Sequence, residues 1–384
     1  MNSEKLGCKE INEVALYIHI PFCKQKCLYC DFPSFSGKEK LMLEYSQALA
    51  KDINSIGERN IKTIFIGGGT PTYLSLEAWN NIKNSIDKLD KTLNLEFTVE
   101  GNPGTFTEEK LKFLKTMGVN RLSIGLQAWQ NSMLKKLGRV HTVEEFIESY
   151  RLARNIGFNN INVDLMFGLP DQSYDNWKET LEQIVEMEPE HISCYSLIIE
   201  ENTHFCKMYD EEKFKLPEEE VERKMYRFAV DFLKSNGYHQ YEISNFSKKN
   251  KECNHNLIYW NLEEYVGCGS ASHSYVDGVR YRKAENIEEY IAGVNLGANL
   301  QLDVHENSVK EDMEEFMFMG LRKIAGISID EFYKRFNVEI YSIYGDVIRK
   351  HVCDGLLVEN KGNLFLSDRG IEVSNVVMSD FLLD

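Results

Sequence analysis

Short runs of β-branched and aliphatic residues alternate with longer amphipathic stretches over the first two-thirds of the chain. The short runs predict six strands, at Ala15–Ile20, Thr63–Ile66, Glu96–Glu100, Arg121–Gly125, Asn160–Phe167 and His191–Ile199. The amphipathic stretches predict helices at Glu39–Ile56, Leu76–Leu89, Thr107–Met117, Val143–Ile156 and Tyr174–Glu186. Six strand–helix units in series are typical of parallel strands covered by helices. Because a closed barrel needs about eight units, we expect an α/β fold with a partial (β/α)6 barrel.

The last third departs from this pattern. A helical run extends from Leu216 to Asn236 and a mixed segment follows it. Beyond about Ser308 the chain predicts three helices and a hairpin with its turn at Asn360–Asn363. This order is typical of a winged helix, so we expect a small C-terminal α+β winged-helix-like domain. The predicted divisions are residues 1–235 for the partial barrel, 236–300 for a connecting segment that completes the core, and 301–384 for the C-terminal domain.

Charge decides how the C-terminal domain is interpreted. Residues 301–384 carry nine Lys and Arg against sixteen Asp and Glu, and the whole chain has a formal charge of −16. An acidic surface repels phosphate backbones, so we expect no nucleic-acid partner and interpret the domain as a packing or interaction unit. The first residues contain no apolar signal segment, and no run approaches the roughly 18 apolar residues of a membrane span. We therefore expect a cytoplasmic location.

The nine cysteines, an odd number in a chain without an export signal, predict reduced thiols. Three of them, Cys23, Cys27 and Cys30, crowd into eight residues directly after the first predicted strand. We expect each of the others to be a small buried hydrophobic residue. These are Cys8, Cys194, Cys206, Cys253, Cys268 and Cys353.

The CxxxCxxC spacing lets three thiolates converge on one face of a cubane iron–sulfur cluster. Three ligands leave one of the irons open, and an open iron can bind a further ligand. Zinc prefers four ligands, usually from two CxxC pairs, and this chain has no second Cys pair and no His pair downstream. A zinc site completed by a distant residue, or three unrelated cysteines, are the alternatives.

At these residues the chain resembles the radical S-adenosylmethionine superfamily, in which CxxxCxxC with an aromatic residue before the last Cys, here Tyr29, is a specific motif. The resemblance implies a 4Fe-4S cluster whose free iron is chelated by the methionine moiety of S-adenosylmethionine. One-electron reduction then cleaves the sulfonium to a 5′-deoxyadenosyl radical. The cofactor carries this chemistry, and the protein positions and tunes it.

Glycine-rich and polar motifs follow the other predicted strands. They are Ile66-Gly-Gly-Gly-Thr-Pro-Thr72, Glu100-Gly-Asn-Pro103, Ser123-Ile-Gly-Leu-Gln127, Leu137-Gly-Arg-Val-His141 and a run from Asn162 to Pro170. Ligand groups gather at the carboxyl ends of parallel strands, so these motifs predict Glu, Gln, Arg and Asp side chains at one mouth. Such groups suit a ligand with ribose hydroxyls, an ammonium and a carboxylate. Taken singly, each group is also an ordinary loop or cap residue.

Together with Tyr17-Ile-His-Ile-Pro-Phe-Cys23, these motifs resemble the oxygen-independent coproporphyrinogen III oxidase family over nearly the whole chain. Several residues match family positions that bind S-adenosylmethionine. They are Tyr17, Tyr29, Gly68, Gly69, Thr70, Glu100, Gln127, Arg139 and Asp164, with Ile198 on the sixth predicted strand as a looser match.

Two departures separate the chain from the oxidase proper. The oxidase carries a fourth cysteine two residues after the cluster motif, where this chain has Phe32, and it has an N-terminal extension, where only about 14 residues precede the first strand here. Both argue against decarboxylase activity, and whether the protein is an enzyme stays open. In contrast, His255-Asn-Leu-Ile-Tyr-Trp260 matches an HNxxYW motif of the haem chaperone, HemW-like branch.

The HNxxYW motif suits haem chemically. A neutral imidazole is a good axial ligand for haem iron, and Tyr and Trp offer flat surfaces for a macrocycle. We predict that His255 binds haem, with a hydrogen-bonded structural histidine as the alternative. His19 is expected to pack or hydrogen-bond near the cluster, and His273 is given no role.

The resemblance implies a haem chaperone that binds haem, a 4Fe-4S cluster and S-adenosylmethionine. Its expected partners are haem, a haem-accepting apo-protein such as a respiratory enzyme, which includes transiently membrane-associated acceptors, and a second copy of the chain in a homodimer. The rival hypotheses are a coproporphyrinogen III oxidase that decarboxylates propionate side chains, and a radical enzyme that opens haem for degradation.

Overall fold

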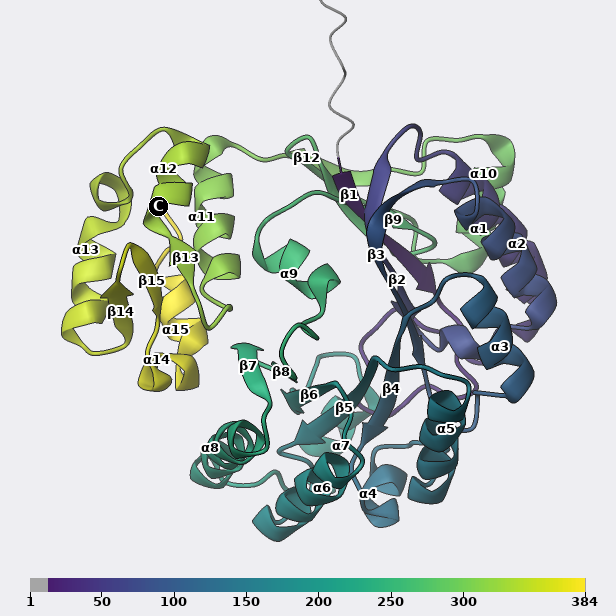
Figure 1. Ribbon diagram of the computed structural model, residues 1–384, viewed down its shortest axis with the longest axis horizontal. Coiled ribbons are helices and arrows are strands. Elements are labelled where there is room, and N and C mark those ends of the chain that lie inside the picture. Colours follow the sequence, from purple (N-terminus) through teal and green to yellow (C-terminus); the bar gives the residue numbers. More distant parts are fainter. Residues whose placement is uncertain (1–12, 384) are drawn as a thin grey trace, which may run out of the picture.

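Six parallel strands, neighbours in chain order, form the centre of the computed structural model, which describes residues 13–383 (Figure 1). They are β1 (Glu13–Ile20), β2 (Asn60–Gly68), β3 (Asp90–Gly101), β4 (Arg121–Gln127), β5 (Ile161–Phe167) and β6 (His191–Ser196). Nearly every residue of β1, β4 and β5 is buried, as expected of strands covered on both faces. The α/β fold with a partial barrel is therefore confirmed.

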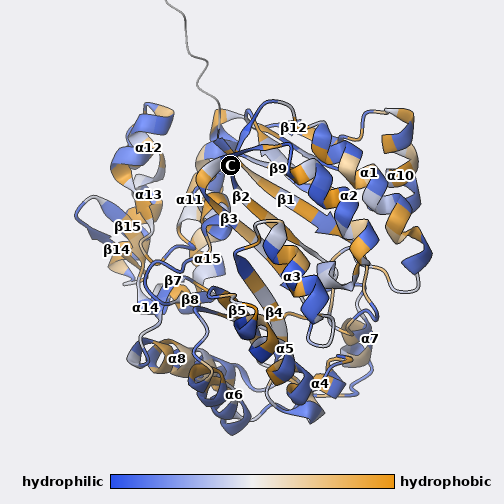
Figure 2. Cartoon of the chain, turned by 45° about the vertical axis from the view of Figure 1, so that its right-hand side comes forward, coloured by the Kyte–Doolittle hydropathy of each residue, from blue (hydrophilic) through white to orange (hydrophobic). Residues whose placement is uncertain are grey.

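Helices cover the outer face of these strands. The predicted ones are α1 (Met42–Asn54), α2 (Leu76–Ile86), α3 (Glu108–Thr116), α5 (Val143–Asn155) and α6 (Tyr174–Glu186). Short 3-10 helices precede α1 and α2, at Glu39–Leu41 and Pro71–Tyr73, and two short helices were not predicted, α4 (Asn131–Lys136) and α7 (His204–Asp210). Ser, Thr and capping-box side chains fix where most predicted helices begin. Figure 2 shows apolar residues concentrated on the strands and polar ones along the outer helix faces.

The strand β6 ends at Ser196, short of the predicted Ile199. Its partner β5 ends at Phe167, which is paired with Ser196, and Gly168 then turns the chain away with a φ of +72°. No strand is left beside residues 197–199, so they cannot continue the ladder.

The sheet extends beyond the six strands at both edges, to twelve strands in all. At one edge β9 (Tyr265–Cys268) runs parallel to β1, and β10 (His273–Val276), β11 (Val279–Arg282) and β12 (Leu302–Glu306) follow antiparallel. At the other, β8 (Asn245–Ser247) pairs with β6 and β7 (His239–Glu242) pairs with β8. The predicted connecting segment thus completes the sheet from both sides. The predicted boundary at residue 300 falls between two paired strands, β11 before it and β12 after it. The boundaries of the connecting segment therefore stay a prediction.

Three further helices belong to this part of the chain: α8 (Glu219–Ser235), α9 (Asn254–Trp260) and α10 (Ile287–Leu296). Helix α8 begins three residues after the predicted Leu216, because Pro217 disfavours helical geometry in the residue before it. Helix α9 carries the HNxxYW motif and contacts both β2 and the C-terminal domain (Figure 1).

The C-terminal domain has the predicted three helices and hairpin. Its elements are α11 (Val309–Gly320), β13 (Ile327–Ser328), α12 (Ile329–Phe336), α13 (Ile340–Cys353), β14 (Leu357–Asn360), β15 (Asn363–Leu366), α14 (Asp368–Glu372) and α15 (Ser374–Ser379). Lys361 and Gly362 both have positive φ, which suits a two-residue hairpin turn at the predicted place. A separate apolar core holds the domain together and includes Leu262 and Tyr275 from the preceding segment. The small domain is therefore packed against the sheet.

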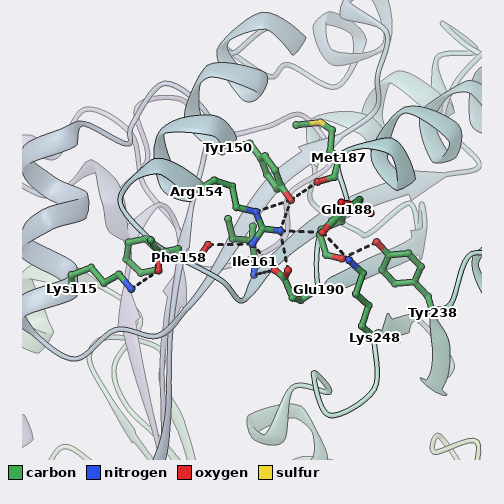
Figure 3. A network of polar contacts seen from close by, with 12 residues as sticks. Lys115, Tyr150, Arg154, Phe158, Ile161, Met187, Glu188, Glu190, Tyr238 and Lys248 are labelled. Atoms are coloured by element: carbon green, nitrogen blue, oxygen red, sulfur yellow. Dashed lines mark hydrogen bonds and ion pairs between the residues drawn. The ribbon is translucent and has the colours of Figure 1, made fainter.

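A polar network closes the amino ends of β5 and β6 (Figure 3). Arg154 of α5 donates to the Glu190 carboxylate at 2.7 Å, and that carboxylate accepts the Ile161 amide at 3.0 Å. The Tyr150 hydroxyl also accepts from Arg154, at 2.6 Å, and donates to the Met187 carbonyl. This end of the sheet is occupied by structural contacts, which leaves the carboxyl ends of the strands for ligands.

The scattered cysteines only partly meet the expectation of burial. Cys194, Cys253 and Cys268 are buried, whereas Cys206 is half-buried. Cys353 is exposed, so its predicted burial is wrong; it is the last residue of α13, where the helix leaves the domain core. Cys8 lies outside the described residues. Among residues 13–383, no helix combines the length and the apolar character needed to cross a bilayer.

Candidate cofactor site

The cysteine motif lies on a loop that leaves the carboxyl end of β1. Backbone hydrogen bonds fix this loop: the Cys23 amide donates to Phe35 and the Leu28 amide donates to Leu137, each at 3.0 Å. Cys23 is buried, and Cys27 and Cys30 are half-buried. All three thiols are free, as the sequence predicts.

Polar groups from other loops approach the three sulfur atoms. Arg139 donates to the Cys27 Sγ at 3.4 Å, and Thr70 Oγ1 lies 3.6 Å from the Cys23 Sγ. Burial raises the pKa of the Cys23 and Cys30 thiols, so a cationic partner is needed to hold them as thiolates. Within residues 13–383, no group of three or more His, Cys, Asp or Glu side chains is arranged to hold a single metal ion. A cubane instead distributes its thiolates over separate irons.

The glycine-rich turn at the end of β2 packs tightly against this loop. A Cβ on Gly69 would lie 2.8 Å from the Phe22 carbonyl oxygen, and one on Gly68, whose φ is +108°, would lie 2.4 Å from the His19 ring. His19 is hydrogen-bonded at both ring nitrogens: Nε2 donates to the Pro33 carbonyl oxygen at 2.8 Å, and Nδ1 pairs with the Tyr17 hydroxyl at 3.0 Å. It therefore packs and hydrogen-bonds beside the cysteine loop, as expected.

Two carboxylates face one another across the strand ends. Glu100, the penultimate residue of β3, accepts the Gly68 amide at 3.2 Å, and Asp164 of β5 accepts from Ser123 at 2.9 Å and from Asn162 at 2.8 Å. Burial, together with the nearby Asp164 charge, raises the pKa of Glu100 to about 8. The Arg121 charge acts in the opposite direction but does not offset burial and the Asp164 charge, and the site therefore accommodates a positively charged ligand group such as an ammonium.

Arg139 connects the cysteine loop to β3 and β4. Its second guanidinium nitrogen donates to Asn102 at 2.6 Å and to the Gly125 carbonyl at 2.5 Å. Asn102 in turn donates to Thr70 at 2.8 Å. At the end of β4, Gln127 has a φ of +77°, a strained conformation for a residue with a side chain and one that clusters at functional sites. Asn102 received no role from the sequence, although its place in the Glu-Gly-Asn-Pro motif is the signal for one.

The predicted S-adenosylmethionine residues are thus mostly brought together. Tyr17, Gly68, Gly69, Thr70, Glu100, Gln127, Arg139 and Asp164 lie at or near the carboxyl ends of β1 to β5. Tyr29 packs against Phe205 of α7, with ring centroids 6.3 Å apart. Ile198 lies beyond the end of β6 and its side chain is 65% exposed, so its predicted place on the sixth strand is wrong.

His255 lies on α9, where it is buried against β2. Its ring stacks on Phe65, and its two nitrogens pair with Thr63 Oγ1 at 2.8 Å and Tyr259 Oη at 2.9 Å. Its backbone amide donates to the Glu96 carboxylate, which caps the start of α9. Burial lowers its pKa to about 3, so the ring is neutral. Both nitrogens are therefore engaged within the protein.

A cavity of about 470 Å³ opens between the cysteine loop, α9, the β10–β11 hairpin and α11. This volume is typical of small-molecule and cofactor sites. Its wall is rich in aromatic side chains, and these are Tyr17, Phe32, Tyr259, Trp260, Tyr265 and Tyr275. The Tyr and Trp of the HNxxYW motif therefore face the same space as Phe32, two residues after the cysteine motif.

Known proteins match this chain along nearly its whole length. Residues 17–184 match the Radical SAM superfamily, and residues 307–373 match the HemN C-terminal domain. The heme chaperone HemW of Bacillus subtilis (strain 168) is 39% identical over 372 residues, which cover 95% of this chain and 98% of that protein. The heme chaperone HemW of Lactococcus lactis is 36% identical, over 96% and 97% of the two chains. The chain belongs to the HemW family.

A solved structure shares the fold of this HemW-family protein. Coproporphyrinogen III oxidase (HemN) from Escherichia coli superposes with a TM-score of 0.84, over 97% of this chain and 90% of that chain, at 19% sequence identity. The match to the radical SAM superfamily implies a 4Fe-4S cluster and S-adenosylmethionine as cofactors. The donor set fits both: three thiols on one loop, a glycine turn that a Cβ would fill, and the buried Glu100 carboxyl group, whose pKa is raised.

Proposed function

We propose that this protein is a haem chaperone, which binds haem and passes it to an apo-protein such as a respiratory haem enzyme. The observation that carries the proposal is the aromatic cavity beside the cysteine loop, into which Tyr259 and Trp260 of the HNxxYW motif project. Flat apolar side chains suit a macrocycle. The HemW name of relatives that align over nearly their whole length supports the same function.

Cys23, Cys27 and Cys30 would hold the cluster, which supplies one electron to S-adenosylmethionine when both are bound. Arg139 holds a positive charge against Cys27 and orders the Asn102 amide. Glu100 and the Gly68 turn would bind the amino group of the methionine moiety, and Asp164 would bind at the far side of the same mouth. The remaining predicted ligand residues, Tyr17, Tyr29, Gly69, Thr70, Gln127 and Ile198, stay predictions.

His255 as a haem ligand also stays a prediction, and its surroundings limit it. The ring would have to release Tyr259 or Thr63 before a nitrogen could reach iron. In the resting arrangement His255 instead holds the Tyr259 hydroxyl, and so orients one aromatic wall of the cavity.

The competing function is a coproporphyrinogen III oxidase, favoured by the shared fold with HemN. The position of that enzyme's fourth cysteine is occupied here by Phe32, whose side chain is 61% exposed and lines the cavity. An apolar ring at that point adds contact surface for a planar ligand and no thiol.

A paired anaerobic assay separates the two functions. The purified chain with reconstituted cluster is titrated with haem, followed by absorption, and is incubated separately with coproporphyrinogen III, S-adenosylmethionine and a reductant. We expect stoichiometric haem binding, transfer to an apo-protein and no decarboxylated product. Protoporphyrinogen formation would establish the oxidase, and failure to bind haem would refute the chaperone. Product analysis with haem and reductant covers the third hypothesis, haem opening.

A further inference from the structure

The aromatic cavity contains two histidines, and they differ in what they are free to do. His19 is buried and pairs at both nitrogens, with Tyr17 and Pro33. His273, the first residue of β10, is exposed, and within residues 13–383 its ring has no hydrogen-bond partner. An unpaired imidazole in an aromatic cavity has a lone pair available for a ligand.

The register of the β10–β11 hairpin adds cations to the same face. His273 pairs with Arg282 and Tyr275 pairs with Arg280, and side chains two apart on a strand point the same way. His273, Tyr275, Arg280 and Arg282 therefore share one face, with the Arg280 guanidinium 4.3 Å from the centre of the Tyr275 ring. Arg280 pairs with Glu315 and Arg282 pairs with Asp303, and both guanidinium groups remain partly exposed.

We propose that this cavity is the haem site and that His273 is the axial ligand to the haem iron, with the macrocycle between Trp260 and Tyr275 and its propionates towards Arg280 and Arg282. The inference rests on the proposed chaperone function and deepens it. The cavity matches this cargo: a flat apolar body, a metal that needs a neutral nitrogen ligand, and two carboxylates that need cations. Met319 of α11 lines the same cavity, and a thioether is a common second ligand to haem iron.

Binding of haem iron by His273 and by His255 would differ in the hydrogen bonds that the protein has to break. His273 gives up no hydrogen bond when it binds iron. His255 would break a hydrogen bond to Thr63 or Tyr259 where α9 packs on β2, and a buried polar group left unpaired there is destabilising. Of the two, His273 is the ring that the folded protein presents to a ligand.

The test is a haem titration of the full chain and four variants, followed by absorption and electron paramagnetic resonance. His273→Ala should weaken binding at least tenfold and remove the spectrum of a nitrogen-ligated low-spin iron. His273→Gly should regain that spectrum when imidazole is added, which a structural role for His273 would not produce. His239→Ala, an exposed histidine on β7, should bind like wild type. His255→Gln, which retains hydrogen-bonding groups, should keep the spectrum of a nitrogen-ligated low-spin iron even where its affinity changes, because Tyr259 on the cavity wall loses its partner ring.

The outcomes separate the inference from the proposed function. If wild type binds haem and His273→Ala gives the same affinity and spectrum, His273 is not the ligand. Loss of the low-spin spectrum in His255→Gln alone, with circular dichroism unchanged, would overturn the assignment in favour of His255. If wild type itself binds no haem, the proposed function fails, and the inference fails with it.

Discussion

At the scale of single residues, the surroundings of each side chain determine its proposed role, and the proposed cluster ligands are the clearest case. Cys23, Cys27 and Cys30 share one loop after β1, whereas Cys206 lies on α7. Exposure does not separate them, since Cys27, Cys30 and Cys206 are all half-buried. Position on this loop, and not residue type or burial, is therefore the basis for proposing which thiols bind iron.

Cys23→Ala should lower the iron content of the anaerobically reconstituted protein from about four per chain to near zero, because the remaining two thiolates cannot retain a cubane. Cys206→Ala is the matched control and should keep its iron. Iron and sulfide analysis with the absorption spectrum gives the result. Zinc without iron in protein handled without oxygen would refute the cluster assignment.

Glu100 predicts how the stability of the cofactor-free chain depends on pH. Its pKa is raised from 4.5 to about 8, so between these values the unfolded chain has released a proton that the folded chain still holds. The contribution of Glu100 to stability is therefore present below pH 4.5, falls as the pH rises, and is constant above about 8.

Glu100→Gln removes this dependence. We expect the variant to melt at nearly the wild-type temperature at pH 4.5 and a few degrees higher at pH 8, as measured by circular dichroism without S-adenosylmethionine. The same variant should bind S-adenosylmethionine more weakly at pH 8, since the ammonium loses its counter-charge. Parallel melting curves at all pH values would contradict the raised pKa.

At the scale of elements, the two ends of the strands have different tasks. The amino ends of β5 and β6 are closed by the Arg154 network (Figure 3), and the carboxyl ends carry the ligand groups. Changes at the closed end should alter folding stability and leave ligand binding intact.

Arg154→Ala should therefore destabilise the protein by about 2 kcal/mol, since it leaves the half-buried Glu190 carboxylate without its cation. Iron content and haem affinity should not change. Arg151→Ala, at an exposed position on the same helix, should have little effect on chemical denaturation. Equal destabilisation by both variants would mean that the network contributes nothing specific.

The elements that the sequence predicts best are the long, strongly patterned ones. The six central strands and α6 follow from β-branched runs and from regular apolar spacing. The edge strand β9 is short and pairs with β1, a segment distant along the chain, so no local pattern indicates it. The overlong sixth strand has the same cause, because its end is set by its partner β5. The β10–β11 hairpin does have a local signal, the Asp277-Gly278 turn with positive φ at both residues, which the predicted elements did not include.

The residues of the candidate site likewise fall into those that a local sequence pattern indicates and those that only the fold brings together. The cysteine motif and the residues after β2 to β5 are local signals, and they were predicted. The burial of His255 between Phe65, Thr63 and Tyr259 depends on how α9 packs on β2, which the HNxxYW letters alone do not reveal. His273 carried no signal of its own, since only the register of the unpredicted hairpin places it beside two arginines.

At the scale of the whole molecule, the aromatic cavity joins parts that are far apart in the chain. Phe32, Trp260, His273 and Met319 come from the cysteine loop, α9, β10 and α11. A ligand that fills this space contacts the partial barrel and the C-terminal domain together. Binding should therefore stabilise their packing as well as the barrel itself.

Haem at about 100 times its dissociation constant should raise the free energy of unfolding by about 2.7 kcal/mol, which is a few degrees in melting temperature. Both domains should melt together at the higher temperature in scanning calorimetry, because they share the ligand. His273→Ala should show a smaller increase at the same haem concentration. Stabilisation of the barrel alone would place haem outside the shared cavity.

The place of β1 in the sheet has a consequence for synthesis of the chain. The cysteine loop follows β1, but β1 pairs with β9, which is made only when residues 265–268 emerge. Until then one edge of β1 has no partner, and an unpaired edge favours association with other chains. The loop proposed to hold the cluster is therefore translated well before β9, which encloses the free edge of β1. Iron insertion is accordingly expected to follow the emergence of β9 rather than that of the cysteine loop itself.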